Sequence, residues 1–319
     1  MKFASRINSF KARPELFFKN NQPGTVNIIQ RMGKVKNLTH VELNYPEHFQ
    51  VNTIEEIKTA IKDNNLIFGG IALRYQKDFL DGEFGNPVPR IRQKAIQITL
   101  EAAKVCRELG GQIVTLWFAN DGFDYPFQIN YEQAYQDVVD AIRLVTKENS
   151  DLTFSFEYKP YEPRVFSLIG DIAATLMLIE EVGTSNLGVT LDFCHMLMKK
   201  ENPAYSLFCA ARKNKLVGFH LNDGYGHFDN GLMLGSVHLM QTLEYIYYAK
   251  KYNFKGLIYF DTFPLREDPV RECEQNIIMY THLSNFIDTV GMQKIDELIK
   301  SHDAIQIQSL LFSLINVKI

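Results

Sequence analysis

The chain has 319 residues, of which 46% are hydrophobic and 22% are charged, and its formal net charge is -3. These values are typical of a globular protein and exclude a disordered, collagen-like or coiled-coil chain. The weak negative charge argues against a general nucleic-acid binder, because such proteins usually carry a basic surface. Four cysteines without a CxxC spacing are too few for a disulfide scaffold and fit a reducing compartment, so we expect a cytoplasmic protein.

No export or membrane segment is expected. The N-terminal stretch MKFASRINSFKARPELFF carries charges among its apolar residues, unlike the core of a signal peptide. The sequence also lacks a run of about 18 apolar residues, which a membrane-spanning helix requires.

Short apolar runs that end in polar or glycine-containing turns alternate with longer amphipathic segments. Runs rich in Val, Ile, Leu and Phe are typical of strands that are buried on both faces. The eight predicted strands are Phe3–Asn8, His40–Leu43, Leu66–Leu73, Gln112–Phe118, Leu152–Tyr158, Gly188–Asp192, Leu216–Leu221 and Gly256–Asp261.

Apolar residues recur at helical spacing between these strands. The pair Gly110–Gly111 is typical of a helix end that precedes a strand. The predicted helices are Ile91–Leu109, Tyr131–Asn149, Ile169–Val182 and Val237–Tyr252, followed after Pro269 by Met279–Val290 and Ile295–Ile315.

Eight strands that alternate with helices indicate a parallel sheet. Eight such units in about 270 residues fit one closed (β/α)8 barrel of the α/β class. The alternative is an open doubly wound sheet, but no GxGxxG or GxxxxGKS motif follows a strand, and we expect no nucleotide cofactor. We predict a single domain, with the barrel over residues 1–275 and the last barrel helix plus a C-terminal helical extension over residues 276–319.

Four predicted strands end in side chains that can bind a metal ion. They are Glu157, Asp192, His220 and Asp261, at the ends of strands five to eight. In a (β/α)8 barrel these ends meet at the face that carries the active site. Three carboxylates at one place repel one another unless a cation neutralises them, so the set predicts a site for Mn²⁺, Mg²⁺, Co²⁺ or Zn²⁺. A single acid after a strand more often caps a helix, and only the succession of four favours ligation.

Two short spacings add candidates beside this set. Lys159 stands two residues after Glu157, so both side chains face one side of an extended chain; its other reading is a simple ion pair. His195 stands three residues after Asp192, which places it either at a second metal or in a hydrogen bond at the barrel rim.

The loops after strands four and seven supply further candidates. Trp117, the only tryptophan, precedes Asp121-Gly122 and is either the wall of a sugar site or part of the core. After strand seven, Asp223, His227 and Asp229 are candidates for second-metal or substrate contacts, although a loop with Asn, Asp and Gly is also ordinary turn chemistry.

Taken together, these motifs resemble those of the xylose isomerase-like superfamily of (β/α)8 barrels, and most of all the sugar isomerases, xylose isomerase and L-rhamnose isomerase. Strands four to eight carry the resemblance, and strands one to three match by architecture alone. The matching motifs are Trp117 with Asp121-Gly122, ExK at Glu157 and Lys159, DxxH at Asp192 and His195, His220, and Asp261.

The resemblance implies roles for the matched residues. The structural metal, which chelates two substrate oxygens, would be held by Glu157, Asp192, His220 and Asp261. A second metal would be held by Asp192, His195 and Asp229, although the isomerases place two acids two residues apart in this loop, where this chain has Asp229 and then Gly231. We predict catalytic roles for Lys159, Glu157 and Asp261, and substrate contacts from Trp117, Asp121, His195 and Asn222.

The implied function is a metal-dependent sugar isomerase that interconverts an aldose and a ketose by a 1,2-hydride shift. Lys159 would contact the carbonyl oxygen of the open-chain sugar. The alternative is an epimerase or decarboxylase that acts on a keto-sugar or sugar acid through an enediolate. Related ketose 3-epimerases typically end strand eight with Glu, so Asp261 and the ExK lysine favour the isomerase.

The motifs indicate the class of substrate and the partners but not the particular sugar. The substrate is expected to be a small sugar or sugar acid, and a sugar acid would need a basic partner, for which Arg6, Arg74, Arg90 and Arg266 are available. A zinc-dependent endonuclease of the superfamily would need a basic DNA-binding face, and a binding module would not need the intact ligand set. We expect no nucleic-acid or membrane partner, and the resemblance implies a homodimer or homotetramer.

Overall fold

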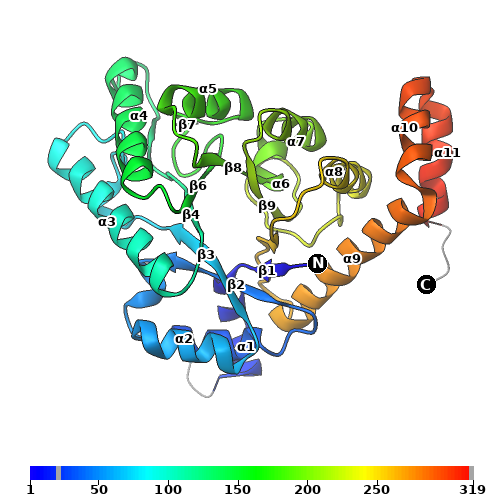
Figure 1. Ribbon diagram of the computed structural model, residues 1–319, viewed down its shortest axis with the longest axis horizontal. Helices are drawn as coiled ribbons and strands as arrows, with labels where there is room; N and C mark the ends of the chain where they lie inside the picture. Colours follow the sequence, from blue (N-terminus) through cyan, green and yellow to red (C-terminus); the bar gives the residue numbers. More distant parts are fainter. Residues whose placement is uncertain (19–22, 316–319) are drawn as a thin grey trace.

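A computed structural model describes residues 1–18 and 23–315 of the chain. Its centre is a sheet of eight parallel strands that curls into a nearly closed barrel (Figure 1). In spatial order the strands are β1 (Phe3–Ser5), β10 (Ile258–Phe260), β9 (Leu216–Leu221), β8 (Leu187–Asp192), β6 (Thr153–Glu157), β4 (Ile113–Leu116), β3 (Ile67–Leu73) and β2 (His40–Tyr45). The predicted α/β barrel class is therefore confirmed.

The first and second strands meet at the seam of the barrel. The amide of Thr39 donates to the carbonyl oxygen of Phe3 at 3.0 Å, and the Thr39 hydroxyl accepts from the Phe3 amide at 2.9 Å. One step further along, Arg6 and Glu42 form a parallel bridge. The Phe3–Thr39 contacts close the seam where the two strands begin, and the Arg6–Glu42 bridge continues it toward the rim that holds the predicted metal ligands.

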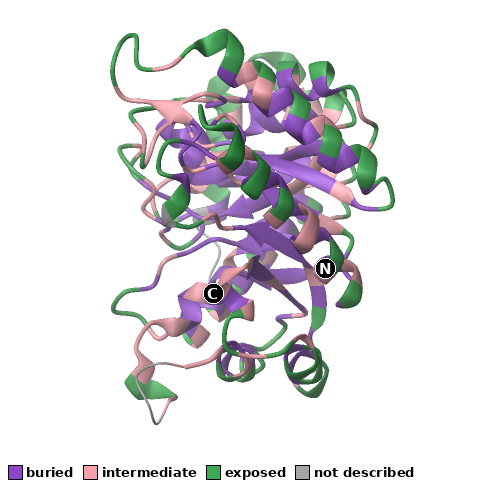
Figure 2. Ribbon diagram, turned by 90° about the vertical axis from the view of Figure 1, so that its left-hand side faces the viewer, coloured by how far each residue is buried: buried purple, intermediate pink, exposed green. Residues whose placement is uncertain are grey.

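Helices cover the outside of the barrel, and the buried residues gather on the strands and on the inner helix faces (Figure 2). The surrounding helices are α1 (Thr25–Met32), α2 (Ile54–Asp63), α3 (Pro89–Glu108), α4 (Tyr131–Glu148), α5 (Ile172–Val182), α7 (Pro203–Arg212), α8 (Leu239–Lys251) and α9 (Pro269–Val290). In the part of the chain that the structure describes, no helix is both long and apolar enough to cross a membrane.

Polar residues at the helix starts explain why several helices begin where they do. Thr53 and Glu56 form a capping box at the start of α2, in which each side chain bonds the other residue's amide. Asp171 accepts from the amide of Ala174 and fixes the start of α5, three residues later than the sequence predicts. At the other end of α5, Gly183 has a φ of 69°, a left-handed conformation that favours glycine.

The predicted strands are confirmed as elements, with differences at their ends. The first strand is shorter than expected, because residues Ile7–Lys11 form a 3-10 turn, η1. The fourth strand ends at Leu116, so Trp117 already belongs to the following loop. That loop holds a strand, β5 (Gly122–Phe123), that the sequence analysis does not predict; it pairs in antiparallel fashion with β7 (Phe166–Ser167).

The C-terminal helical extension is confirmed, but its predicted last helix, Ile295–Ile315, is two helices. They are α10 (Met292–Ser301) and α11 (Ala304–Ile315), which stand beyond α9 at the edge of the molecule (Figure 1). His302 between them has a φ of 55°, and Asp303 accepts from the amides of Ile305 and Gln306, so the chain ends one helix and caps the next. The predicted boundary at residue 275 falls inside α9, and the single-domain organisation stays a prediction.

Candidate metal centre

The four side chains predicted to bind a metal lie together at the C-terminal rim of the barrel. Glu157, Asp192, His220 and Asp261 come from or directly follow β6, β8, β9 and β10, which are neighbours in the sheet. Each of them is buried, with at most 6% of its surface exposed. One possible ligand atom from each residue lies within 4.8 Å of those from the others, a spacing that would allow one ion to touch all four.

Strand register explains this convergence. Asp192 and His220 are paired directly across β8 and β9, and the amide of Asp261 donates to the carbonyl oxygen of Leu221 at 3.0 Å. Asp192 also caps the short helix α6 (Phe193–Met198), because its Oδ1 accepts from the amide of His195 at 3.0 Å. Asp192 therefore plays the capping role expected of a lone acid while its carboxylate faces the cluster.

Burial and the mutual proximity of the four side chains shift their pKa values. Burial would raise the pKa of Glu157, but the neighbouring His220 and His195 outweigh it and lower that pKa to about 2. Nδ1 of His220 lies 3.2 Å from Oε1 of Glu157, and although burial opposes the charge, Glu157 helps to raise the pKa of His220 to about 10. Burial raises the pKa of Asp192 to about 7, with Asp229 and Asp261 adding to the rise. Without a metal, protons on His220 and Asp192 thus take up part of the negative charge.

The residues present fit a divalent metal ion. Oε2 of Glu157 is buried and has no hydrogen-bond partner among the described residues, and the buried Oδ1 of Asp261 has Nε of Arg6 at 3.3 Å as its ion-pair partner. Unpaired carboxylate oxygens are costly to bury unless a cation binds them. Two ligand atoms at right angles, each about 2.1 Å from a metal, lie about 3 Å apart, close to the 3.2 Å between His220 and Glu157. Carboxylate and imidazole donors suit the four metals named above.

A second cluster shares Asp192 and adds His195 and Asp229, whose ligand atoms also lie within 4.8 Å of one another. Nδ1 of His195 lies 2.9 Å from the carbonyl oxygen of Tyr158, so an N–H there leaves Nε2 facing Asp229 at 3.3 Å. The ammonium of Lys159 lies 3.1 Å from Oδ2 of Asp229, the same oxygen that His195 faces. Oδ1 of Asp229 is buried without a partner in the described part of the chain. A second metal here stays a prediction.

Lys159 is held at the edge of both clusters. Its ammonium lies 3.0 Å from Oε2 of Glu162 and 3.1 Å from Asp229, so neither contact is the ion pair with Glu157 that its spacing allowed. Burial favours the neutral amine, but Asp229 and Glu162 outweigh it and raise the pKa of Lys159. The lysine is therefore a fixed cation beside the predicted metal site.

Asn222 lies against the cluster and is fully engaged by protein groups. Its amide donates to both carboxylate oxygens of Asp192, at 3.2 and 3.0 Å, and to the carbonyl oxygen of Asp261 at 3.1 Å. Its Oδ1 accepts from the amide of Cys194 at 2.8 Å. This bonding makes Asn222 a residue that orients Asp192, and the predicted substrate contact stays untested.

The carboxylate of Asp121 accepts hydrogen bonds from backbone amides of a neighbouring loop. It accepts from the amides of Glu83, Phe84 and Gly85 at 2.7, 3.1 and 2.9 Å, which ties the loop after β3 to the loop after β4. In the same way, Asp223 accepts from the amides at the start of α8. Of the acids predicted in these loops, the structure brings Asp229 to the metal ligands and places Asp121 and Asp223 in loop anchoring.

Trp117 is partly exposed at the rim, at the end of β4. The guanidinium carbon of Arg74, which follows β3, lies 4.3 Å from the centre of its ring. If Trp117 forms a wall of the site, the guanidinium group of Arg74 therefore places a positive charge next to that wall.

Glu42 is a further candidate that the sequence analysis does not single out. It faces the barrel interior from β2, since a Cβ on Gly69 would lie 3.2 Å from Cγ of Glu42 and 2.6 Å from a methyl of Leu257. Burial raises its pKa to about 7; His220 opposes the rise, whereas Glu157 and Asp261 add to it. The only sequence signal is a charged residue within the apolar run HVELNY.

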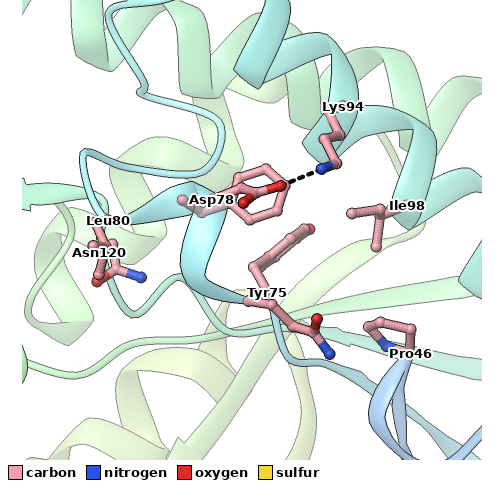
Figure 3. Close-up of a pocket in the computed structure, with 9 residues that line it drawn as sticks. Pro46, Tyr75, Asp78, Leu80, Lys94, Ile98 and Asn120 are labelled. Carbon is pink, nitrogen blue, oxygen red and sulfur yellow. Dashed lines mark hydrogen bonds and ion pairs between the residues drawn. The ribbon is translucent and has the colours of Figure 1, made fainter. Parts of the chain in front are cut away.

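A separate cavity of about 560 Å³ lies beyond the rim, between the ends of β2, β3 and β4 and helix α3. Figure 3 shows Lys94 from α3 paired with Asp78 across it, and Tyr75 and Asn120 among its walls. None of the residues predicted to bind the metal lines this cavity, so we do not assign the chemistry to it.

Fold and site together define a barrel with a buried carboxylate and imidazole cluster at its active rim. Residues 35–277 match the family model described as "Xylose isomerase-like TIM barrel". The chain belongs to this family, which includes sugar isomerases and epimerases.

Individual relatives agree with this assignment. Xylose isomerase of Thermus thermophilus is 26% identical over 225 residues, which are 67% of this chain and 58% of the relative. Among solved structures, a D-tagatose 3-epimerase-like protein superposes with a TM-score of 0.70 at 14% identity, over 91% of this chain and all of that one. D-psicose 3-epimerase of Clostridium cellulolyticum gives 0.66 at 14% identity, over 89% and 99%. The structures at this identity show the shared fold.

The curated relatives are longer proteins. The chain spans about half the length of the curated relatives it matches, between 34% and 58% of each. Activity, substrate and assembly of those proteins therefore apply to this chain only as proposals.

Proposed function

We propose that the protein is a divalent-metal-dependent sugar isomerase that interconverts an aldose and a ketose. The observation that supports this most is the joint position of Glu157, Asp192, His220 and Asp261, with Lys159 fixed beside them. The four residues would hold the metal ion, and the aldose–ketose pair would bind at the same rim. When bound, a divalent cation withdraws electron density from the sugar carbonyl and lowers the pKa of the neighbouring hydroxyl.

The reaction balances within the sugar. In the open-chain aldose, hydrogen moves with its electron pair from C2 to C1, the proton of the C2 hydroxyl leaves, and the former carbonyl oxygen at C1 gains a proton. The product is the ketose, and no oxidant or reductant is consumed.

Lys159 can assist by donating a hydrogen bond to the oxygen at C1. Its ammonium has three N–H groups, and the contacts with Glu162 and Asp229 use two of them. The third can support the negative charge that develops on the oxygen. Oδ1 of Asp229 is buried and has no partner in the described chain, so it can accept a hydrogen bond from a substrate hydroxyl.

An enediolate mechanism is the second candidate, as in an epimerase or a decarboxylase. It is favoured by two carboxylates, Glu157 and Asp261, that enter the cluster from β6 and β10, on its two sides. One carboxylate could remove a proton from carbon and the other could return one to the opposite face.

Solvent isotope incorporation distinguishes the two. Purified protein is supplied with Mn²⁺, Mg²⁺ or Co²⁺ and a panel of aldoses, ketoses and sugar acids in D₂O. Conversion with little deuterium on carbon supports the hydride shift. Near-complete incorporation refutes it and supports the enediolate, and absence of any conversion with every metal contradicts both. A cytoplasmic location and a homodimer or homotetramer remain part of this proposal.

A further inference from the structure

Two arginines stand at the rim of the barrel, on either side of β2. Arg6 directly follows β1 and Arg74 directly follows β3. Both strands end at the face that holds the predicted metal ligands, so both guanidinium groups belong to the mouth of the site. Of the four arginines that the sequence makes available, Arg90 is instead exposed on α3 and Arg266 lies in the loop before α9.

Arg74 is held in place but lacks a polar partner. Its guanidinium stacks over the ring of Trp117 at 4.3 Å, which fixes its plane. Nη1 is buried and has no hydrogen-bond partner in residues 1–18 and 23–315, and no carboxylate of these residues lies within 4.0 Å of the group. Burying a guanidinium nitrogen without a partner costs free energy that a bound anion would offset.

Arg6 is engaged at one end only. Its Nε lies 3.3 Å from Oδ1 of Asp261, and its guanidinium carbon lies 4.6 Å from the centre of the Phe263 ring. The side chain is 27% exposed, and the described residues accept no hydrogen bond from its Nη groups. Arg6 thus presents donors toward the mouth while Asp261 fixes its Nε side.

The charge of the mouth depends on what fills the cluster. A divalent cation would offset two of the three carboxylates of Glu157, Asp192 and Asp261. Arg6 already lies against the third carboxylate, and His220 would be neutral as a ligand. Arg74, which has no carboxylate of the described residues within 4.0 Å, would remain a positive charge without a direct ion-pair partner, oriented and partly desolvated. Such a group binds carboxylate or phosphate oxygens through two parallel hydrogen bonds.

We propose that the carbohydrate taken by this site carries an anionic oxygen group, a carboxylate or a phosphate, which Arg74 binds with help from Arg6. This inference rests on the proposed function, since it names the substrate class of the same site. The anionic group would lie at the β1–β3 side of the mouth, and the reacting carbons would lie at the ligands on β6, β8, β9 and β10.

Three hexoses that differ only at C6 provide the test. They are D-glucose, D-glucuronate and D-glucose 6-phosphate, and their dissociation constants are measured by calorimetry with Mn²⁺-loaded protein. We expect one of the two anions to bind at least about tenfold more tightly than glucose, because a hydrogen bond to a charged group contributes about 1.5–3 kcal/mol. Comparison of D-glucuronate with D-glucose 6-phosphate shows whether the site prefers a carboxylate or a phosphate.

Variants tie the preference to Arg74. Arg74→Met should lower the affinity for the preferred anion by about ten- to a hundredfold relative to glucose, with the Mn²⁺ content retained. Arg74→Lys keeps the charge but not the planar fork, and should retain part of the preference. Arg90→Met, on the exposed face of α3, is the matched control and should change nothing.

The outcomes separate this inference from the proposed function. Equal affinity for glucose and both anions, or an anion preference that survives in Arg74→Met, overturns the inference. Conversion of a neutral sugar with refusal of both anions overturns it too, while the proposed function stands. If Mn²⁺ binds but no member of the wider sugar panel binds or is converted, both fail together.

Discussion

The ammonium of Lys159 and the imidazole of His195 face the same oxygen of Asp229, at 3.1 and 3.3 Å. Asp229 therefore joins the lysine after β6 to the helix that Asp192 caps. Burial opposes a charge on His195, but Asp192 and Asp229 outweigh it and raise the pKa of His195 to about 9, so Asp229 has two cationic neighbours when no metal is bound. Such a carboxylate is a poor place for an additional cation, because like charges repel. In this arrangement the protein itself supplies a positive charge where the family resemblance implies a second metal.

Replacing Lys159 with Met should reduce turnover and leave the metal in place. Removing one donor to a developing oxyanion typically lowers kcat by about a hundredfold or more. Steady-state kinetics with the substrate identified by the panel measures this, and metal analysis checks the Mn²⁺ content. Lys199→Met removes an exposed lysine that pairs with Asp171 at 3.3 Å, away from the cluster, and should have no effect. Unchanged kcat in Lys159→Met would contradict the role proposed for the lysine.

Asp192→Asn should abolish tight metal binding. The amide can still cap α6 by accepting from the amide of His195, so the helix should persist, but the negative charge at the cluster is lost. We expect Mn²⁺ affinity to fall by more than about a hundredfold. Mutating a residue that only hydrogen-bonds to a metal ligand already lowers metal affinity by about 10- to 100-fold, and Asp192 is itself a predicted ligand. Isothermal titration and circular dichroism measure binding and fold. Asp171→Asn, which changes the cap of α5, is the control; full metal content in Asp192→Asn would refute the metal site.

Asn222→Ala tests a residue that positions a ligand. The change removes the hydrogen bonds that hold the Asp192 carboxylate and leaves all four predicted ligands in place. Mn²⁺ affinity should fall by about 10- to 100-fold. Asn253→Ala, at an exposed position after α8, should leave affinity unchanged. If Asn222 only contacts sugar, the variant would instead raise KM and keep its metal affinity.

The buried pair Glu83 and Asp121 should make stability depend on pH. Burial, and next the carboxylate of Asp121, raise the pKa of Glu83 to about 8. The unfolded chain ionises this group near pH ~4.3, so unfolding releases a proton at intermediate pH and stability falls as pH rises between these values.

Thermal unfolding across this pH range checks the expectation. Glu83→Gln removes the ionisable group, while its side-chain oxygen can still accept from Asn120, so its Tm should fall less than that of the natural chain as pH rises. Glu132→Gln, exposed in the first turn of α4, should follow the natural chain. Parallel Tm curves for the natural chain and Glu83→Gln would contradict the shifted pKa.

Periodic features predicted the fold well because they are local. The apolar runs gave all eight barrel strands, and the glycines at 110 and 111 marked the end of α3. The predicted first strand, Phe3–Asn8, is too long because Ile7 is buried in a 3-10 turn, which an apolar pattern alone does not separate from a strand. The break at His302 was also beyond the pattern, since it depends on a left-handed residue and a cap.

The site was predictable where one residue type recurs at equivalent strand ends. This held for the juxtaposition of Glu157, Asp192, His220 and Asp261. It did not hold for side-chain direction inside loops, so Asp121, which bonds backbone amides of the neighbouring loop, resembled a substrate ligand in the sequence. Nor could sequence locate Arg74, whose significance depends on Trp117 and on an unpaired nitrogen.

The origin of the groups around the mouth divides the barrel into two halves. The predicted ligands all come from the half formed by β6, β8, β9 and β10, whereas Arg6, Arg74 and Trp117 come from the half formed by β1 to β4. On the proposed roles, reactivity and substrate choice reside in separate stretches of the chain. Substitutions after β3 or β4 can retune which molecule is accepted without dismantling the reaction centre, which gives the scaffold a simple route to new substrates in evolution or in the laboratory.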